Sequence, residues 1–350
     1  MNLLITGGAG FIGSNFVRYM MGKYPDYRIV NYDNLTYAGN LESLKDVEKR
    51  KNYVFVKGDV LDSKLLDETF RKYSIDGVAH LAAESHVDRS IMNPVEFLKT
   101  NVMGTHAVLE ATRKYWKENP SATRRVFLNV STDEVYGSIE GKSFTEDSNY
   151  NPNSPYSASK AGADHLVRAY GKTYGLPAIT THCSNNYGPY QFPEKLIPVV
   201  IFNAIEGKLI PVYGEGKNVR DWLYVDDHCK ALDAVIHKGI QGETYNIGGD
   251  NEWTNIDLVR RICSILDELK PAKEPYSSLI KFVTDRPGHD LRYSIDASKI
   301  RRELGWSPAP HAFEDALKET VKWYLANPDW INCVKSGEYT AYYEKNYKGR

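Results

Sequence analysis

The chain has 350 residues, of which 42% are hydrophobic and 25% are charged, and its formal net charge is −1. This composition is typical of a globular protein with two domains or one large α/β unit, and it gives no electrostatic reason to expect nucleic acid or a membrane as a partner. No apolar run approaches the roughly 18 residues of a membrane span, and a first strand at Asn2 leaves no room for a signal peptide. The four cysteines form no CxxC pair, so we expect reduced thiols in a cytoplasmic protein without a metal site.

Short runs of β-branched residues alternate with helical patterns along most of the chain. Strands are predicted at 2–6, 28–32, 53–57, 77–82, 125–130, 177–182 and 243–247. Helices are predicted near 13–22, 62–73, 95–117, 156–174 and 226–238. This alternation favours the α/β class, with a doubly wound parallel sheet that is covered by helices on both faces.

The alternation breaks after residue 183. The segment 184–222 is rich in Asn, Gly, Pro and Tyr, and 251–311 mixes short helices with loops. We therefore predict a main domain of residues 1–183 with about 223–250. Residues 184–222 and 251–350 form a smaller α/β lobe that binds the substrate.

Three glycines, Gly7, Gly10 and Gly13, lie between the first strand and the first helix. In a dinucleotide-binding (Rossmann) unit, one glycine makes the tight turn, one lets the backbone approach a pyrophosphate, and one lets helix and strand pack closely. Asp33 ends the second strand about 20 residues further on, where an acid binds the adenosine ribose and disfavours NADP. The pattern predicts bound NAD. The alternative is an ordinary glycine-rich turn with a surface aspartate.

Polar residues follow several other predicted strands. Asp59 follows the third strand, Glu84-Ser85-His86 follows the fourth, and Ser131-Thr132-Asp133-Glu134 follows the fifth. Because the carboxyl ends of parallel strands meet at one edge of the sheet, these residues are expected to share a cleft.

Tyr156 and Lys160 are spaced i, i+4 near the start of a predicted helix, so both side chains lie on one face. A nearby ammonium lowers the pKa of a phenol, and a phenolate can take the proton of a sugar hydroxyl while hydride leaves the same carbon. The alternative is a Tyr–Lys pair on a helix surface.

Asp133 and Glu134 are two adjacent carboxyls that a simple dehydrogenase does not need. The segment 131–134 also fits a capping box, but the two glycines in 135–141 make a poor helix. Two carboxyls whose pKa values differ can act as acid and base, which suits removal of a proton next to a ketone while a hydroxyl leaves the next carbon.

These motifs resemble those of the extended short-chain dehydrogenase/reductases, and within them the dTDP-glucose 4,6-dehydratases. The resemblance runs essentially end to end. It rests on Gly7-x-x-Gly10-x-x-Gly13, Tyr156-x-x-x-Lys160 and the segments 80–90, 131–137, 185–190, 193–198 and 285–290.

The resemblance implies a reaction and a role for each catalytic residue. Tyr156, tuned by Lys160 and assisted by Thr132, is implied to be the base at the glucose O4 as hydride passes from C4 to NAD. Glu134 then removes the C5 proton and Asp133 protonates the departing C6 hydroxyl. Return of hydride to C6 and of a proton to C5 gives the 4-keto-6-deoxy sugar, and it regenerates a tightly bound NAD.

The resemblance also implies which residues bind each ligand. For NAD they are Gly7, Gly10, Phe11, Ile12, Gly13, Asp33, Asn34, Leu35, Thr36, Asp59, Val60, Leu81, Ala82, Ala83, Ser85, Thr100, Tyr156, Lys160 and Asn186. For the nucleotide sugar they are Ser85, His86, Thr132, Asn185, Lys195, Leu196, Pro211, Tyr213, Arg220, Asn255, Arg286, His289 and Tyr347.

Some of these roles agree with the chemistry of the residue types. Arg220 and Arg286 suit a diphosphate because a guanidinium pairs with two phosphate oxygens, and Tyr213 offers a ring on which a base can stack. The alternatives are a surface ion pair between Arg220 and Asp221 and a hydrogen-bonding loop histidine at His289.

Three other functions remain open. They are 4,6-dehydration of UDP-glucose or another nucleoside-diphosphate glucose, 4-epimerisation of a nucleotide sugar, and non-catalytic NAD binding. The carboxyl pair argues against the epimerase, and the Tyr–Lys pair argues against the non-catalytic protein. The family also implies a homodimer through helices near 95–117 and 156–174. Val102, Ala107, Val108 and Ala111 have helical spacing, although this stripe could equally pack on its own sheet.

Overall fold

The computed structural model describes residues 1–121, 123–309 and 313–334. Its main element is a seven-stranded sheet, in which every strand pair is parallel, with the order β10-β6-β5-β4-β1-β2-β3. The strands are β1 (Asn2–Thr6), β2 (Arg28–Asp33), β3 (Tyr53–Lys57), β4 (Gly77–His80), β5 (Val126–Thr132), β6 (Ala178–Cys183) and β10 (Thr244–Ile247). The predicted strands and the α/β fold class are confirmed.

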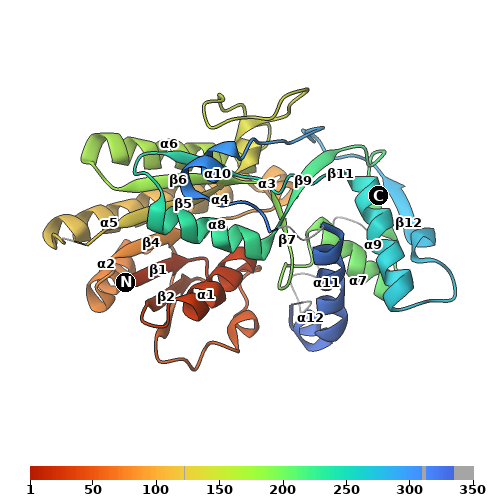
Figure 1. Ribbon diagram of the computed structural model, residues 1–350, viewed down its shortest axis with the longest axis horizontal. Helices are drawn as coiled ribbons and strands as arrows, with labels where there is room; N and C mark the ends of the chain where they lie inside the picture. The colour runs from red at the N-terminus through yellow and green to blue at the C-terminus, as the bar shows by residue number, and fades with distance from the viewer. Residues whose placement is uncertain (122, 310–312, 335–350) are drawn as a thin grey trace.

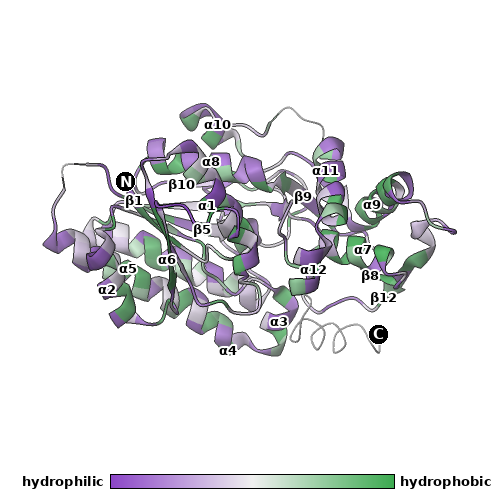
Figure 2. Cartoon of the chain, turned by 90° about the horizontal axis from the view of Figure 1, so that it is seen from below, coloured by the Kyte–Doolittle hydropathy of each residue, from purple (hydrophilic) through white to green (hydrophobic). Residues whose placement is uncertain are grey.

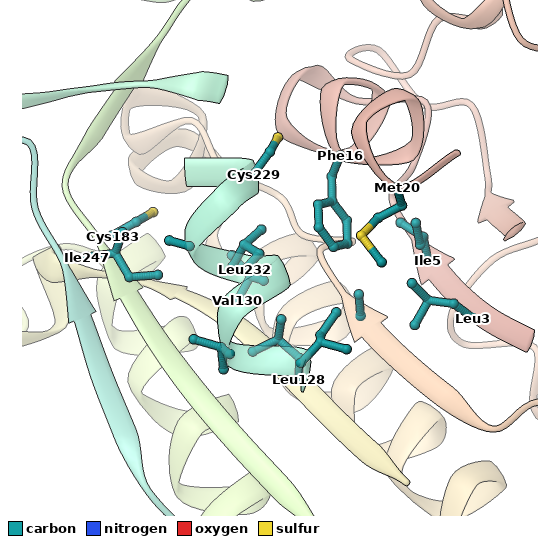
Figure 3. Close-up of a cluster of buried hydrophobic side chains, with 14 of the residues drawn as sticks. Leu3, Ile5, Phe16, Met20, Leu128, Val130, Cys183, Cys229, Leu232 and Ile247 are labelled. Atoms are coloured by element: carbon teal, nitrogen blue, oxygen red, sulfur yellow. The ribbon is translucent and has the colours of Figure 1, made fainter. Parts of the chain in front are cut away.

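Helices cover both faces of this sheet, as predicted. One face packs against α1 (Phe11–Lys23), α8 (Val225–Lys238) and α10 (Ser298–Leu304). Figure 3 shows Phe16 and Met20 of α1 meeting Ile5 and Leu128 of the sheet, with Leu232 of α8 beside them. The other face packs against α2 (Ser63–Tyr73), α5 (Thr105–Glu118) and α6 (Pro155–Tyr174).

The predicted helix 95–117 is interrupted. It consists of α4 (Pro94–Phe97), a π-helical stretch η2 (Leu98–Gly104) and α5, and the short α3 (Val87–Met92) precedes it. Within η2, the side chain of Asn101 binds the backbone of Glu84, accepting from its N–H at 2.8 Å and donating to its carbonyl at 3.0 Å. A π-helical turn breaks the regular spacing, and such turns are frequent at functional sites.

The smaller lobe has its own sheets and core, and lies on the right in Figure 1. Three strands, β7 (Asn185–Tyr187), β9 (Val219–Tyr224) and β11 (Glu252–Thr254), form one sheet, and β8 (Ile210–Tyr213) pairs with β12 (Ile280–Val283). Its helices are α7 (Leu196–Ile205), α9 (Asn255–Leu269), α11 (Phe313–Ala326) and α12 (Pro328–Val334). Short 3-10 turns are η1 (Leu41–Leu44), η3 (Asp133–Tyr136) and η4 (Tyr276–Leu279).

Helix α9 is a correction to the prediction of short helices in 251–311, because it has 15 residues. Thr254 caps its first turn by accepting from the N–H of Asp257 at 3.2 Å, and Leu258, Ile262 and Leu266 are buried at helical spacing. In Figure 2 apolar segments of α7 and α9 lie next to each other. The apolar contact with α7 stabilises α9 at this length.

The two hydrophobic cores give only partial information on the predicted domain boundaries. Leu223 to Ile247 contribute to the core of the large sheet, and so do Ala297, Ile300 and Trp306, although 297–306 falls in the segment assigned to the smaller lobe. The domain limits therefore stay a prediction. Within the described ranges, no helix combines the length and the apolar composition needed to cross a membrane.

Candidate active site

The large sheet reverses its strand order between β1 and β4, since β2 and β3 extend to one side of β1 and β4, β5 and β6 to the other. A cavity of about 310 Å³ opens at the carboxyl ends of these strands. This is where open α/β sheets bind ligands. Of the residues that follow the third, fourth and fifth strands, all but His86 line the cavity, including Asp59, Ser85 and Thr132, so the structure brings together most of the groups expected to share a cleft.

The cavity is lined by most of the residues that the resemblance assigns to NAD. They are Gly7, Gly10, Phe11, Ile12, Gly13, Asp33, Asn34, Thr36, Asp59, Val60, Leu81, Ala82, Ala83, Ser85, Thr100, Tyr156, Lys160 and Asn186. Leu35 is not part of the lining. Its backbone N–H instead donates to the Asp33 Oδ1 at 2.8 Å, and it holds a positive φ of 56°.

The glycines have distinct geometry. Gly7 has a φ of 70°, and a Cβ there would lie 2.6 Å from the backbone nitrogen of Ala82. A Cβ on Gly13 would overlap the carbonyl oxygen of Gly7, so this glycine lets α1 pack on the turn. Gly10 caps α1 without a side-chain hydrogen bond. The first N–H groups of α1 therefore face the cavity side of the turn without side-chain acceptors, as an anion site requires.

Asp33, at the end of β2, and Asp59, just after β3, line the same cavity. The Asp33 carboxylate accepts from the N–H groups of Ala9 (2.9 Å) and Leu35 (2.8 Å). Burial raises the Asp33 pKa, and these two hydrogen bonds oppose the rise. Asn34 donates to Asp59 Oδ2 at 2.8 Å, which ties the loop after β2 to the loop after β3.

The turn η3 presents the two adjacent carboxyls. Thr132, not Ser131, caps it, since the Glu134 N–H donates to Thr132 Oγ1 at 3.3 Å. The capping-box alternative is therefore wrong, and the sequence did not indicate a 3-10 turn. Asp133 is 3% exposed. Asp133 Oδ2 and Glu134 Oε2 are buried without a hydrogen-bond partner, and both residues line the cavity. Orphaned buried oxygens need an explanation, and a bound hydroxyl is one that fits here.

The environment raises the pKa of both carboxyls, but to different extents. Burial raises the pKa of Asp133 well above its usual value, and the negative charges of Glu134 and Asp221 add to the rise. Burial also raises the pKa of Glu134, but the cations Arg286, Arg220 and Lys195 oppose it. The protonated form is therefore favoured more strongly at Asp133 than at Glu134, where nearby cations oppose the effect of burial.

Tyr156 and Lys160 lie on one face of α6 and both line the cavity. The expected lowering of the Tyr156 pKa is wrong for the protein alone. Burial raises this pKa well above its usual value, the charge of Glu134 adds to it, and a hydrogen bond with Thr132 opposes it. Lys160 instead donates to the Val130 carbonyl at 2.9 Å, and burial lowers its own pKa.

The residues assigned to the nucleotide sugar divide into two groups. Ser85, Thr132, Asn185 and Lys195 line the cavity. The lining does not include His86, Leu196, Pro211, Tyr213, Arg220, Asn255, Arg286 and His289. Tyr347 lies outside the described residues, and so does the tail expected to fold back over the site.

Two members of the second group, Tyr213 and Arg286, share Asp88 on α3 as a hydrogen-bond partner. Tyr213 donates to Asp88 Oδ2 at 3.0 Å, and Arg286 donates to Asp88 Oδ1 at 3.3 Å. His289 meets the Tyr213 ring edge to face with centroids 6.2 Å apart. The charges of Arg286 and Arg220 also reach Glu134. The ring of Tyr213 and the two cations Arg220 and Arg286 are thus grouped on the side of Asp88 and Glu134.

The alternatives for these residues can now be compared with the structure. A surface ion pair of Arg220 with Asp221 is wrong, because both are buried and Asp221 accepts from the N–H groups of Gly249 (2.7 Å) and Asn251 (2.6 Å). Arg220 lies over the Tyr293 ring at 4.2 Å. His289 is a loop hydrogen bonder as the alternative proposed, with Nδ1 2.6 Å from Asp285 Oδ1. This contact leaves Nε2 for other partners.

Sequence reasoning missed several lining residues. They are Tyr32, Ala38, Gly39, Gly58, Val130, Cys183, Ser184, Gln191, Phe192 and Glu194. Glu194 is buried beside Lys195, and burial raises its pKa to about 7. It accepts from Tyr37 OH at 3.2 Å, across 157 residues of chain. The only sequence signal for a role of Glu194 was its position next to Lys195 in the segment 193–198.

Comparisons with known proteins agree with this geometry. The family model of GDP-mannose 4,6 dehydratase matches residues 4–320. The dTDP-glucose 4,6-dehydratase of Salmonella typhimurium is 55% identical, with all of both chains covered. The crystal structure of the Bacillus anthracis dTDP-glucose 4,6-dehydratase in complex with NAD is 49% identical, with a TM-score of 0.85 over 96% of this chain and 100% of that one.

A UDP-glucose 4-epimerase from Thermotoga maritima is more distant, at 29% identity and a TM-score of 0.81, with 94% of this chain and 100% of that chain covered. Dehydratases and epimerases thus share this fold, and the full-length identity is far higher to the dehydratases. The chain belongs to the extended short-chain dehydrogenase/reductase family and, within it, to the dTDP-glucose 4,6-dehydratases.

Proposed function

We propose that this chain converts dTDP-glucose to dTDP-4-keto-6-deoxyglucose and water, with NAD as a resident cofactor. The single observation that carries the proposal is the pair Asp133 and Glu134. Each has a buried carboxyl oxygen without a partner, in the same cavity as Tyr156 and Lys160. A nucleotide-sugar epimerase has no use for such a pair.

The lining of the cavity fits NAD. Gly7 and Gly13 leave no room for a side chain where the turn approaches the cavity, the start of α1 offers N–H groups, and Asp33 and Asp59 lie at the far end. NAD would accept hydride from the sugar and later return it, and its oxidised ring would bring a positive charge. That charge would offset the Glu134 charge that raises the pKa of Tyr156.

In the first half of the reaction, Tyr156 takes the proton of the C4 hydroxyl while hydride leaves C4. Thr132 interacts with the Tyr156 hydroxyl and holds it in place. Lys160, anchored on the Val130 carbonyl, keeps a cation beside the site. The product of this half is a 4-keto sugar, whose C5 proton is acidic because the carbanion left behind is delocalised onto the ketone oxygen.

In the second half, water is eliminated across C5 and C6. Glu134 acts as the base and takes the C5 proton, and the charges of Arg286, Arg220 and Lys195 oppose the rise that burial causes in its pKa. Asp133, whose pKa burial raises well above its usual value, acts as the acid and gives its proton to the C6 hydroxyl, and the C6–O bond breaks. Hydride returned to C6 and the proton that Glu134 returns to C5 complete the product and restore Glu134. The proton that Tyr156 took from the C4 hydroxyl makes up, through exchange with solvent, for the proton that Asp133 gave to the departing water.

The nucleotide is proposed to occupy the side of the cavity near Asp88. Arg220 and Arg286 would pair with the diphosphate and Tyr213 would stack on the base. Thymine differs from uracil by one methyl group, which is worth about 1–3 kcal/mol in an apolar pocket. The preference for dTDP over UDP is therefore a matter of degree.

Product mass tests the proposal. The purified protein, without added NAD, is incubated separately with dTDP-glucose, UDP-glucose and CDP-glucose. Loss of one water from dTDP-glucose, faster than from the other two, is the expected result. An isomer of unchanged mass would show epimerisation, and no reaction with any of them would overturn the proposal.

We also propose that the protein is a cytoplasmic homodimer. Of the predicted interface stripe, Ala107, Val108 and Ala111 are buried within this chain against its own sheet, as the alternative had it, and Val102 is half-buried. The dimer is better supported by exposed apolar side chains on α3, α4 and η2, namely Ile91, Met92, Val95, Leu98 and Met103. Sedimentation at micromolar concentration tests the dimer. Within the described residues, Cys183, Cys229, Cys263 and Cys333 form no disulfide, which supports the proposed reducing location.

A further inference from the structure

A buried polar cluster lies behind the proposed catalytic side chains, and none of the roles assigned above uses it. Its centre is Asp164 on α6 and His182 on β6, which are 4% and 0% exposed. Oδ2 of Asp164 lies 3.2 Å from Nε2 of His182. We call this pair the hub.

Strand β5 is attached to the hub by two short hydrogen bonds. Asn129 Nδ2 donates to Asp164 Oδ1 at 2.7 Å, and Ser131 Oγ donates to Asp164 Oδ2 at 2.7 Å. Ser131 directly precedes Thr132. The contact therefore fixes the end of β5, where Thr132 caps η3, relative to helix α6.

The turn η3 is attached through its last residue. Tyr136 OH lies 2.8 Å from His182 Nδ1 and donates to Asn246 Oδ1 at 3.0 Å, and Tyr150 OH lies 2.8 Å from His182 Nε2. Burial raises the pKa of both phenols, so both stay neutral hydroxyls. This fixes the single turn that carries Asp133 and Glu134.

Helix α6 completes the arrangement. Asp164 lies one turn after Lys160 and two turns after Tyr156, on the same face of the helix. Each catalytic segment therefore has its own attachment to the hub. Tyr156 and Lys160 are attached through Asp164, Thr132 through Ser131, and the carboxyl pair through Tyr136.

We propose that Asp164, acting with His182, is a positioning residue that aligns the Tyr156–Lys160 pair with the Asp133–Glu134 pair. This inference rests on the proposed function, in which one bound sugar must be in register with Tyr156 at C4 and with the carboxyls at C5 and C6. Because such alignment is sensitive to shifts of about 1 Å, which can cost roughly 10²-fold in rate, loosening the hub slows turnover without removing a reacting group.

The test is Asp164→Asn, which keeps the shape of the side chain and removes its charge and one acceptor. Tyr136→Phe is the second variant. It removes one hydroxyl of the cluster and keeps the ring, which stacks on Phe144 at 5.2 Å. The control is Thr320→Val on α11, which removes an equally buried hydroxyl that donates to the Ala316 carbonyl at 2.8 Å, far from the site in the sequence.

The readouts are kcat, KM, melting temperature and the near-ultraviolet absorbance of reduced nicotinamide during turnover of dTDP-glucose. We expect Asp164→Asn to lower kcat by roughly 10–100-fold with KM changed by less than about threefold. A larger share of the enzyme should hold reduced cofactor, because C4 is still oxidised while elimination lags. Tyr136→Phe should change both quantities in the same direction and by less. Thr320→Val should lower the melting temperature only.

Two results would overturn the inference. One is an Asp164→Asn enzyme that melts lower but keeps the wild-type kcat and the wild-type share of reduced cofactor. If Asp164→Asn does not fold, the Tyr136→Phe enzyme decides. The same kcat and the same share of reduced cofactor as in Thr320→Val would then overturn the inference. Failure of the wild-type protein to dehydrate dTDP-glucose would refute the proposed function itself, and with it the inference.

Discussion

At the dinucleotide end of the cavity the walls are made largely by backbone, through the turn at Gly7 and Gly13 and the N–H groups of Ala9 and Leu35 on Asp33. On the side proposed for the nucleotide sugar, beside the cavity, long side chains hold one another, as Asp88 holds Tyr213 and Arg286. The difference indicates that the dinucleotide end is preorganised by its backbone for a ligand that remains bound. The nucleotide-sugar side holds its side chains in contacts that an incoming diphosphate can replace.

The largest effect is expected between the two ends, at the carboxyl pair. Glu134→Gln should lower the rate of product formation by roughly 10²–10⁴-fold, because the amide cannot take the C5 proton. Oxidation at C4 should continue, so reduced cofactor should accumulate and no solvent deuterium should enter C5. Mass spectrometry and absorbance check both. Normal deuterium uptake would assign the base to another residue.

The dinucleotide end should tolerate no added side chain. Gly13→Ala places a Cβ against the Gly7 carbonyl, so it should destabilise the fold by about 1–3 kcal/mol and reduce the NAD retained on purification. The matched control is Gly22→Ala in the same helix, where the added Cβ meets nothing within 4 Å. That change should stabilise the protein by about 0.5–1 kcal/mol. Equal NAD retention in the two variants would contradict a preorganised backbone site.

The nucleotide-sugar end should respond in affinity and not in stability. Asp88→Asn weakens the hydrogen bonds to Tyr213 and Arg286. Because charged hydrogen bonds contribute about 1.5–3 kcal/mol, we expect KM for the nucleotide sugar to rise about tenfold, with kcat nearly unchanged. Glu215→Gln, in an exposed pair with Lys217, is the control and should change nothing measurable. A fall in kcat at constant KM would place Asp88 in the chemistry instead.

The smallest expected effect is the change of kcat with pH, which is at most about tenfold for each pH unit. Glu134 must be ionised and its pKa is raised by burial, so activity should be lost as the pH falls through a value above the ordinary range of a glutamate. Asp133 must be protonated and its pKa is raised well above the usual value, so activity should fall again as the pH rises through that pKa. His237→Asn tests a histidine origin, since Asp233 raises the pKa of His237. If either limb of the pH profile of kcat shifts in His237→Asn, that limb does not report the titration of Asp133 or Glu134.

The same contrast explains what the sequence could predict. The dinucleotide end is built from contiguous motifs, and Gly7 to Gly13 with Asp33 could be assigned from strand, turn and helix patterns alone. Glu194 and Gln191 reach the cavity only because the smaller lobe folds against the large sheet, and no local pattern encodes that contact.

Electrostatics were the least predictable part. The i, i+4 spacing of Tyr156 and Lys160 was correct, but the direction of the Tyr156 pKa shift was not. It depends on burial and on Glu134, which no spacing rule includes. The turn η3 and the π-helical η2 were missed because their stability comes from contacts with distant residues, such as Glu84 with Asn101.

The most direct test of the proposed reaction is the fate of hydrogen at C4. dTDP-glucose carrying deuterium at C4 is given to the purified protein without added NAD, and the product is analysed by nuclear magnetic resonance. We expect the deuterium to appear in the C6 methyl group of a 4-keto-6-deoxy product. Deuterium that remains at C4 of an isomer, or that is lost to solvent, would contradict the assignment of this chain as a 4,6-dehydratase.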